Sequence, residues 1–453
     1  MSITRTIARN ILALAASEPP AEAIAKARLA VFDTLGVTLA GSTHEGAAKL
    51  RSVILPSAAP GTSLAIGTTR RIDPADAAQI NGMAGHMLDF DDSNSQFRGH
   101  PSVAILPATL ALAETHPTSG MDLLRAYIVG FETGARVGMG VGPYEYNKGW
   151  HPTTSIGIFG AIGACAAQEK LDEDQITMAL GIAAAMCSGI KSNFGSMTKP
   201  FGVSQAARNA VIAIKLAQAG FTSKEDAFEH PHGYLNVYCD GPEHYDVSKI
   251  VEGWGKPLCI LDLGIKQKRF PCCYACLPPI DAMQQVMERD GLKPEQVEAI
   301  DIAVHPIRFP HINVPDPKSP LDAKFSVSYC LSRVLLTGRL AMSDFEGDTW
   351  CDPTTRALMQ RVAFHSYKGE NLGGAELAVT TTDGRTLHGH VESAFGASYA
   401  HSLPEHLLEE KFSECAGRAL PAAAVEELTA GLRNLCQVTD IRTLTAIMEK
   451  LKS

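Results

Sequence analysis

A helical spacing of apolar residues runs through the first half of the chain, and it restricts the possible folds more than any other feature. Residues 21–39 carry apolar side chains at steps of three and four, which places them on one face of a helix. Further helices are predicted over residues 73–87, 103–116 and 120–138. Because an apolar helix face has to be buried against another element, these segments are predicted to pack helix on helix.

Small residues predict that two further helices pack closely. Gly157, Gly160 and Gly163 follow one another at intervals of three, and the helix predicted over residues 175–189 is rich in alanine. The glycine spacing differs from the phosphate-binding pattern G-x-G-x-x-G, and no strand precedes it. The segment is therefore predicted to be a packing face and not a cofactor-binding loop.

A different pattern begins near residue 265. Residues 299–304 and 377–381 alternate between apolar and polar side chains, as half-buried strands do. Asp383-Gly384 predicts a hairpin turn that leads into a strand over residues 387–393. Residues 265–395 are therefore predicted to form an inserted α+β domain.

Amphipathic helices follow the insert and complete the predicted domain plan. They are expected over residues 405–412, 421–435 and 440–451, with apolar faces that pack back on the first half of the chain. The prediction is a mostly α-helical protein with one large helical domain. That domain consists of residues 1–264 and 396–453.

Composition limits the partners and surroundings of the chain. A formal charge of −9 over 453 residues argues against a nucleic-acid-binding surface, which would need a basic face. No apolar run is long enough to cross a membrane. The 11 cysteines follow no regular framework, which predicts free thiols in a reducing, cytoplasmic compartment. Cys272, Cys273 and Cys276 lack a matching second pair and are predicted to be structural, so no metal is assigned to them.

Residues 85–102 form a dense polar segment between two predicted helices. The segment reads G-H-M-L-D-F-D-D-S-N-S-Q-F-R-G-H-P-S, and its Ser, Asn, Gly and Pro residues predict a loop. It could be a solvated connector stabilised by Asx turns, or a functional site held between rigid helices. The order H-x-x-D-x-D-D followed by a later histidine also offers imidazole and carboxylate ligands for a metal ion.

Two further polar segments carry candidate functional residues. His151 precedes the glycine-rich helix, where the helix dipole would favour a bound anion. Lys199 lies in a predicted loop over residues 192–202, just before a helix predicted over residues 205–219. A lysine in such a loop is either solvated or functional, and its surroundings do not decide between the two.

Six short motifs, in this order, resemble the MmgE/PrpD family over nearly the whole chain. They are the segment 85–102, W-H-P-T-T at 150–154, T-K-P-F at 198–201, G-F-T at 220–222, K-R-F-P-C-C at 268–273 and F-S-V-S-Y at 325–329. The family includes 2-methylcitrate dehydratase, cis-aconitate decarboxylase and iminodisuccinate epimerase. The resemblance implies a helical domain with an inserted α+β lid domain, an active site between the domains, a homodimer, and no metal or organic cofactor.

The resemblance also implies a set of site residues. Asp89 and Ser93 would bind the substrate, and the catalytic residues would be His100, His151, Lys199, Lys268 and Tyr329. The shared chemistry moves a proton at a carbon next to a carboxylate, which calls for a base and for fixed positive charge. A histidine would carry the proton, the lysines would hold substrate carboxylates or act as the base, and Tyr329 would donate a proton. Asp89 would orient a histidine or cap a helix.

Several functions follow from these residues. The first prediction is a lyase, a dehydratase or decarboxylase, that acts on a small di- or tricarboxylate. The alternatives are an epimerase of a dicarboxylate such as iminodisuccinate, a metal-dependent hydrolase, and a non-catalytic carboxylate-binding protein. Gly202 and Leu277 stand where many family members have histidine, which changes the carboxylates and hydroxyls that the site can hold.

Overall fold

The chain divides into two compact units in the computed structural model, which describes residues 2–262, 264–367, 373–396 and 402–452. A helical unit comprises residues 1–267 and 405–453, and a second unit comprises residues 268–404. Helices make up most of the described chain, which confirms the predicted mostly α-helical fold. No helix in the described ranges combines the length and the apolar character needed to cross a bilayer.

Six long helices form the centre of the helical unit. They are α2 (Ala21–Ser42), α4 (Pro74–His86), α5 (Ser102–Ala113), α6 (Gly120–Val141), α9 (Gly157–Gln168) and α11 (Thr198–Gln218). Helix α4 packs on α11, α6 packs on α9, and α5 contacts both α4 and α9. Every residue of α5 is buried, and its sequence is correspondingly apolar on all sides. The spacing of apolar residues in the sequence therefore located the core helices.

Glycines set the close approach of α6 and α9. A Cβ atom added at Gly130 would lie 2.6 Å from the Gly160 carbonyl oxygen, and one added at Gly163 would lie 2.3 Å from the Thr133 hydroxyl. No side chain fits at such distances, so the two backbones meet directly. The predicted packing role of the Gly157–Gln168 segment is confirmed.

Further elements from the first half of the chain belong to the same unit. They are α1 (Ile3–Ala15), α3 (Glu45–Ile54), α7 (Tyr144–Lys148), α8 (Pro152–Ser155), α10 (Glu173–Ala185), α12 (Tyr234–Cys239), α13 (Val247–Val251), and the strand pair β1 (Pro60–Leu64) and β2 (Arg71–Ile72). The prediction of a loop over residues 192–202 was wrong at its end, because α11 already begins at Thr198. Pro200 lies in its first turn, where the missing N–H of proline costs no helical hydrogen bond.

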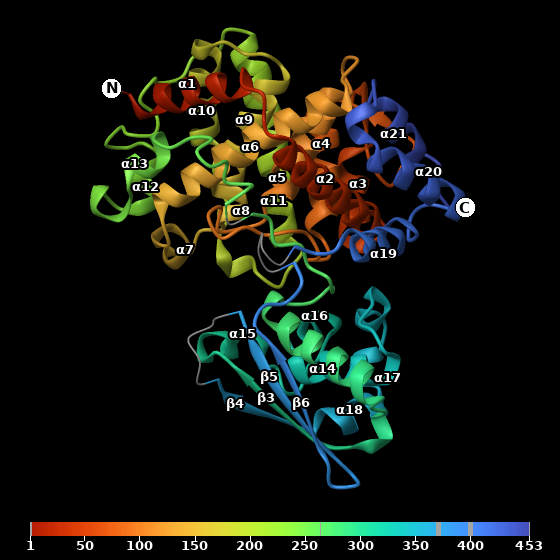
Figure 1. Ribbon diagram of the computed structural model, residues 1–453. Coiled ribbons are helices and arrows are strands. Elements are labelled where there is room, and N and C mark those ends of the chain that lie inside the picture. The colour runs from red at the N-terminus through yellow and green to blue at the C-terminus, as the bar shows by residue number, and fades with distance from the viewer. Residues whose placement is uncertain (1, 263, 368–372, 397–401, 453) are drawn as a thin grey trace. The chain divides into compact units, whose positions relative to one another are not determined.

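Helices from the end of the chain complete the helical unit. They are α19 (Glu405–Ala416), α20 (Ala422–Arg433) and α21 (Arg442–Met448). Helices α19 and α20 contact α2, near the start of the chain, and Figure 1 shows the blue C-terminal helices beside the red ones. A buried ion pair links them, with the Lys411 ammonium 2.7 Å from the Asp33 carboxylate. The C-terminal helices are thus part of the core of this unit.

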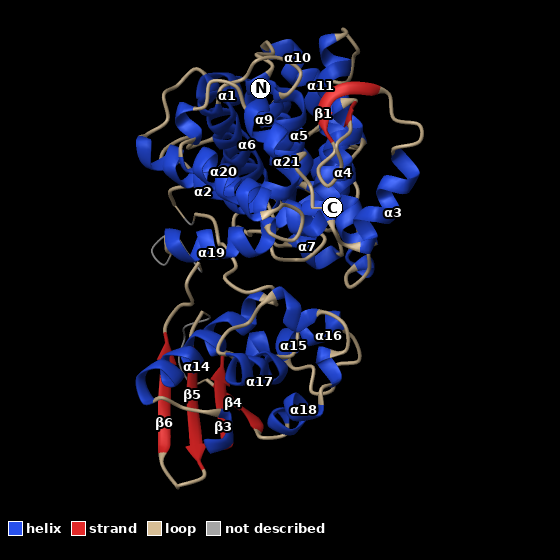
Figure 2. Cartoon of the chain, turned by 90° about the vertical axis from the view of Figure 1, so that its right-hand side faces the viewer, coloured by secondary structure: helices blue, strands red, loops and turns tan. Residues whose placement is uncertain are grey.

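A four-stranded sheet with strand order β4-β3-β5-β6 organises the second unit (Figure 2). The strands are β3 (Val297–Val304), β4 (Val362–Ser366), β5 (Ala375–Thr381) and β6 (Thr386–Val391). The helices of this unit are α14 (Leu277–Asp290), α15 (Phe309–Ile312), α16 (Pro320–Ala323), α17 (Val327–Thr337) and α18 (Pro353–Met359). Strand β4 runs parallel to β3, whereas β5 is antiparallel to both β3 and β6. Helix α14 packs on β5, β6 and α17. The predicted strands and the hairpin at Gly384, whose φ is +83°, are confirmed.

Candidate functional site

The polar segment between α4 and α5 is a loop held by buried hydrogen bonds. The Asp92 carboxylate accepts hydrogen bonds from the Ser102 hydroxyl and from the Ser102 backbone N–H, and the Asn94 side chain accepts one from Phe97 N–H. The Lys411 ammonium donates to the Phe90 carbonyl oxygen at 2.9 Å. The interpretation of this segment as a solvated connector was wrong, because its carboxylates and main chain are fixed from within the helical unit.

Three imidazoles gather around this loop. The ring centroids of His86 and His100 are 4.7 Å apart, and those of His86 and His151 are 5.9 Å apart. They come from the end of α4, the end of the loop, and the residue before α8. His151 is 5 % exposed and His86 is 2 % exposed, so both rings are almost withdrawn from water. The structure therefore brings the two predicted catalytic histidines, His100 and His151, close to His86.

Asp91 lies between two of these imidazoles. Its Oδ2 atom is 2.8 Å from Nδ1 of His86 and 3.0 Å from Nδ1 of His100. Burial of Asp91 opposes its ionisation, but the two imidazoles hold the pKa of this carboxyl well below its usual range. A buried carboxylate that contacts Nδ1 fixes the orientation of the ring and leaves Nε2 for other partners.

A lysine and a second carboxylate extend the group. The Lys199 ammonium, in the first turn of α11, is 2.7 Å from Oδ1 of Asp89. The same Asp89 oxygen is 3.9 Å from Nε2 of His100. The Phe194 ring lies 4.9 Å from His151 and 5.3 Å from the Lys199 ammonium, measured to its centroid. Lys199, Asp89, His100, Asp91 and His86 thus form one continuous polar chain.

The backbone of Asp89 is in an unusual conformation. Its φ of +53° lies in the left-handed region, which residues other than glycine rarely adopt and which asparagine and aspartate tolerate best. Strain of this kind clusters at functional sites. The conformation accompanies the contact between the Asp89 carboxylate and Lys199.

The surroundings of His86 and His151 keep both rings neutral. Burial lowers the pKa of His86 to about 4, although Asp91 acts in the opposite direction. Burial, together with His86 and the Lys199 charge, lowers the pKa of His151 to about 2. The Nε2 atom of His86 is buried and has no hydrogen-bond partner among the described residues. Such an orphaned polar atom is suited to contact a bound ligand.

These two histidines each contribute a loss of stability in acid, whereas burial raises the pKa of Asp92 to about 8 and that of Glu145 to about 7, and these two carboxyls contribute in the opposite direction. A histidine in the unfolded chain binds a proton near pH 6.5, whereas the folded rings resist protonation down to about pH 4 and pH 2. At these two histidines the unfolded state therefore binds more protons below pH 6.5, and their contribution to the free energy of unfolding decreases as the pH falls. The expected loss between pH 6.5 and 5 is on the order of 1 kcal/mol per pH unit for each histidine.

Denaturant unfolding at a series of pH values measures this loss. Relative to the parent chain, the non-titrating variant His151→Gln should lack the contribution of one histidine to the pH dependence of the free energy of unfolding. Asp91 contributes little slope in this window, because its carboxyl is ionised in both states above pH 5. Equal slopes in the parent and the variant would contradict the assignment of a buried, neutral His151.

Four side chains of this group could also hold a metal ion. His86, Asp89, Asp91 and His100 each offer a ligand atom, and these atoms lie within 4.8 Å of one another. The Lys199 ammonium already contacts one oxygen of Asp89, so a metal ion bound there would compete with this ammonium for the Asp89 carboxylate. Imidazole and carboxylate ligands suit zinc and similar divalent ions.

Three predicted site residues remain, one in the same loop and two in the second unit. Ser93 is half-buried in the loop, and its backbone pairs with that of Lys266. Lys268 and Tyr329 belong to the second unit, where both side chains are buried. The Tyr329 hydroxyl donates to the Asp344 carbonyl oxygen, and burial raises its pKa to about 12. The structure thus groups Asp89, His100, His151 and Lys199 within the helical unit.

Two residues of the group, His86 and Asp91, were predicted only as possible metal ligands and were not among the predicted catalytic or substrate-binding residues. Both lie in the polar segment, so their residue types were visible in the sequence. The contact between them was not visible, because His86 ends α4 and Asp91 turns back to it from an irregular loop. The sequence also did not show that both side chains are almost fully buried.

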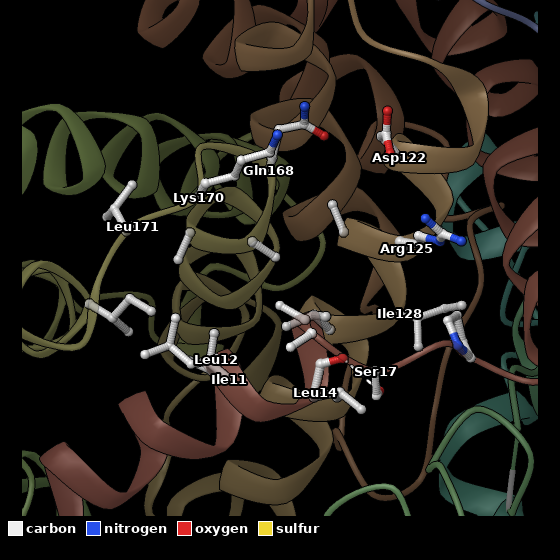
Figure 3. A pocket seen from close by; sticks show the side chains of 18 of the residues that line it. Ile11, Leu12, Leu14, Ser17, Asp122, Arg125, Ile128, Gln168, Lys170 and Leu171 are labelled. Atoms are coloured by element: carbon white, nitrogen blue, oxygen red, sulfur yellow. Dashed lines mark hydrogen bonds between the residues drawn. The ribbon is translucent and has the colours of Figure 1, made fainter.

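A cavity of about 560 Å³ lies in the helical unit between α1, α6 and the end of α9 (Figure 3). Apolar side chains such as Ile11 and Ile128 form its walls, and Gln168 and Arg125 add polar groups. The described residues that line it include none of the predicted site residues. The cavity is therefore a feature separate from the histidine group.

Two family models match the chain. The model described as the MmgE/PrpD N-terminal domain matches residues 5–245, and the one described as the MmgE/PrpD C-terminal domain matches residues 270–435. Together they include the helical part up to α12 and most of the second unit.

Curated relatives align over nearly their full length. A protein named cis-aconitate decarboxylase from Homo sapiens is 28% identical, with 99% of this chain and 95% of the relative aligned. A protein of the same name from Aspergillus terreus is 25% identical over 96% of this chain and 93% of the relative. A cis-aconitate decarboxylase-like protein from Aspergillus oryzae is 25% identical over 99% and 97%.

Proposed function

This chain belongs to the MmgE/PrpD family, and on that premise we propose that it is a lyase that acts on a small di- or tricarboxylate. Cis-aconitate is the first substrate to test, because several relatives that align over nearly the whole chain are named cis-aconitate decarboxylases. The observation that supports the proposal most is the group of three imidazoles beside the Lys199 and Asp89 ion pair.

Decarboxylation explains why such a group would be needed. The bond between a carboxylate and its carbon breaks, CO₂ leaves, and the electron pair stays on the carbon skeleton as an enolate-like anion. A proton is then added to that carbon. Fixed positive charge stabilises the anion, and a group that titrates near neutral pH supplies the proton. Dehydration of a hydroxy acid makes the same two demands, with water as the leaving group.

Within this proposal, His100 carries the proton. It is the most exposed of the three imidazoles, and the Asp91 carboxylate lies 3.0 Å behind its Nδ1 atom. That arrangement leaves Nε2 for the substrate, as in other carboxylate–histidine pairs. His151 stays neutral, so it would hold a substrate carboxyl or hydroxyl group without adding charge.

Lys199 supplies positive charge to a substrate carboxylate. Its ammonium is paired with Asp89 in the described structure, and a bound carboxylate would share or replace that partner. From the family resemblance we assign Lys268 as a second carboxylate-binding lysine. Tyr329 could donate a proton only after its hydroxyl leaves the Asp344 carbonyl oxygen.

Two departures from the family pattern bear on the choice of substrate. Gly202 lies on α11, where an added Cβ atom would be 3.2 Å from the Thr154 side chain. Leu277 is the buried first residue of α14 in the second unit. Neither position offers an imidazole to a carboxylate. A substrate with fewer polar groups than citrate therefore suits this chain best.

Proton NMR in deuterated water tests the proposed reaction. Purified protein is mixed separately with cis-aconitate, 2-methylcitrate, citrate, iminodisuccinate and tartrate. A lyase should convert at least one of them into a decarboxylated product or a new alkene, and cis-aconitate is expected to react. Deuterium that enters a carbon without a new product would replace the proposal by an epimerase. Turnover that a chelator abolishes would favour a metal-dependent enzyme, and no turnover with any of the five would contradict the proposal.

A further inference from the structure

A cluster of three thiols lies in the core of the second unit and is distinct from the histidine group of the helical unit. The sulfur atoms of Cys272, Cys276 and Cys330 lie within 4.8 Å of one another, and each residue is at most 1 % exposed. They come from the segment before α14, the N-cap of α14, and the fourth residue of α17. Buried cysteines commonly act as small apolar residues, but three that converge on one point form a set of ligands.

The spacing of the sulfur atoms suits a metal ion. With metal–sulfur bonds of about 2.3 Å, the sulfur atoms of a trigonal or tetrahedral complex lie about 3.8–4.0 Å apart. The limit of 4.8 Å in the described structure is close to that range. Backbone hydrogen bonds fix the segment, since Cys276 N–H donates to Cys273 and Cys273 N–H donates to Lys324, both at 2.9 Å. The ligands are therefore largely in place before an ion enters.

The electrostatic surroundings favour one thiolate, at Cys272, whereas burial raises the pKa of the Cys276 and Cys330 thiols. Burial of Cys272 opposes its ionisation, but thiol hydrogen bonds from Cys276 and Cys330 lower the pKa of its thiol. The charges of Lys268 and Lys324 lower it further, so that it falls well below its usual range. The start of α14 and the first turn of α17 add the positive ends of two helix dipoles. A buried thiolate needs such compensation, and a cation supplies it most directly.

We propose that Cys272, Cys276 and Cys330 form a binding site for a soft, thiophilic cation, with Cu(I) as the best match. Thiolate ligands select Cu(I) and Zn(II), and structural zinc sites almost always use four protein ligands. This cluster holds three ligand groups among the described residues. Binding forms three metal–sulfur bonds, one to the Cys272 thiolate and two that replace the S–H bonds of Cys276 and Cys330, and it releases those two protons. The resulting complex carries two negative charges, which the ammonium groups of Lys268 and Lys324 offset.

The bound ion would tie the start of α14 to α17. These helices already pack against each other, and α14 also covers strands β5 and β6. The site would therefore stabilise the second unit and would take no part in the proton transfer. Its test can be read without any enzyme assay.

Native mass spectrometry of the reduced, full-length protein tests the site. The protein is treated with Cu(I) without oxygen, and a competing chelator then removes weakly bound metal. One copper per chain should remain, ultraviolet charge-transfer absorbance should appear, and the melting temperature should rise. Cys272→Ser and Cys330→Ser should each lose the retained copper. Cys415→Ser, a buried cysteine of the helical unit, is the matched control and should keep it.

Three outcomes would overturn the proposal. The first is that no copper remains on the parent chain, and the second is that Cys330→Ser retains as much copper as the parent. The third is a disulfide between two of the three cysteines that forms readily in air, with no copper retained after reduction. If the serine variants do not fold, proton release is measured while the parent chain is titrated with Cu(I). Absence of proton release would also exclude ligation by the thiolates.

Discussion

Replacing His100 by alanine is expected to lower kcat with cis-aconitate by about 10²–10⁴-fold, the usual contribution of a general acid or base. The expectation rests on the position of His100, with Nδ1 at the buried Asp91 carboxylate and Nε2 beside Asp89. If Lys199 holds the substrate, KM should change much less than kcat, because the loss then affects the transition state more than the bound substrate. Steady-state rates of product formation by NMR provide the measurement.

A surface histidine supplies the control for that experiment. His232 is exposed in the same helical unit, and His232→Ala should leave both kcat and KM unchanged. Circular dichroism should show that His100→Ala is folded. A His100→Ala enzyme with parental kcat would remove His100 from the reaction and leave His151 as the candidate proton carrier.

Replacing Lys411 by alanine is expected to destabilise the helical unit by about 3–5 kcal/mol, the usual cost of leaving one partner of a buried ion pair alone. The Lys411 side chain is almost fully buried and lies 2.7 Å from Asp33. It also donates to the Phe90 carbonyl oxygen and lies 4.0 Å from the centroid of the Phe90 ring. The free energy of unfolding in denaturant, followed by far-ultraviolet circular dichroism, measures the loss.

Two further variants distinguish this ion pair from an ordinary surface pair. Lys215→Ala breaks a half-exposed pair with Asp73 in the same unit and should cost about 1 kcal/mol or less. The double variant Asp33→Val with Lys411→Met removes both charges and should recover part of the lost stability. Recovery should be incomplete, because the Phe90 carbonyl oxygen still loses its donor. If Lys411→Ala lowered the free energy of unfolding by no more than Lys215→Ala does, the Lys411 charge would not be effectively buried.

The sequence predicted the helices best where their apolar spacing was regular. The predicted start of α6 at Gly120 matches the structure, and α5 begins one residue before its predicted start at Val103. The start of α11 was placed seven residues too late, since residues 192–202, which include Pro200, were predicted to be a loop. Proline prevents helical hydrogen bonding only beyond the first turn, and the sequence does not show which turn it occupies.

The site was predicted in its residue types and only partly in its arrangement. The sequence pointed to Asp89, His100, His151 and Lys199, which the helical unit brings into one group. It offered His86 only as a possible metal ligand, because the contact of its ring with Asp91 depends on the orientation of a side chain at a helix end. The roles of all these residues stay predictions until variants are measured.

The Lys411 contact also affects when the chain can mature during synthesis. Phe90 and Lys411 are separated by 321 positions, and the whole second unit is encoded between them. The ribosome therefore synthesises Asp33 and the polar loop long before it synthesises Lys411. The helical unit can reach its final packing only after α19 has been synthesised. Until then α2 lacks the packing of α19 and α20, and such incompletely packed apolar surface is what chaperones bind. The polar loop is thus made early, but it can acquire its contact with Lys411 only near the end of synthesis.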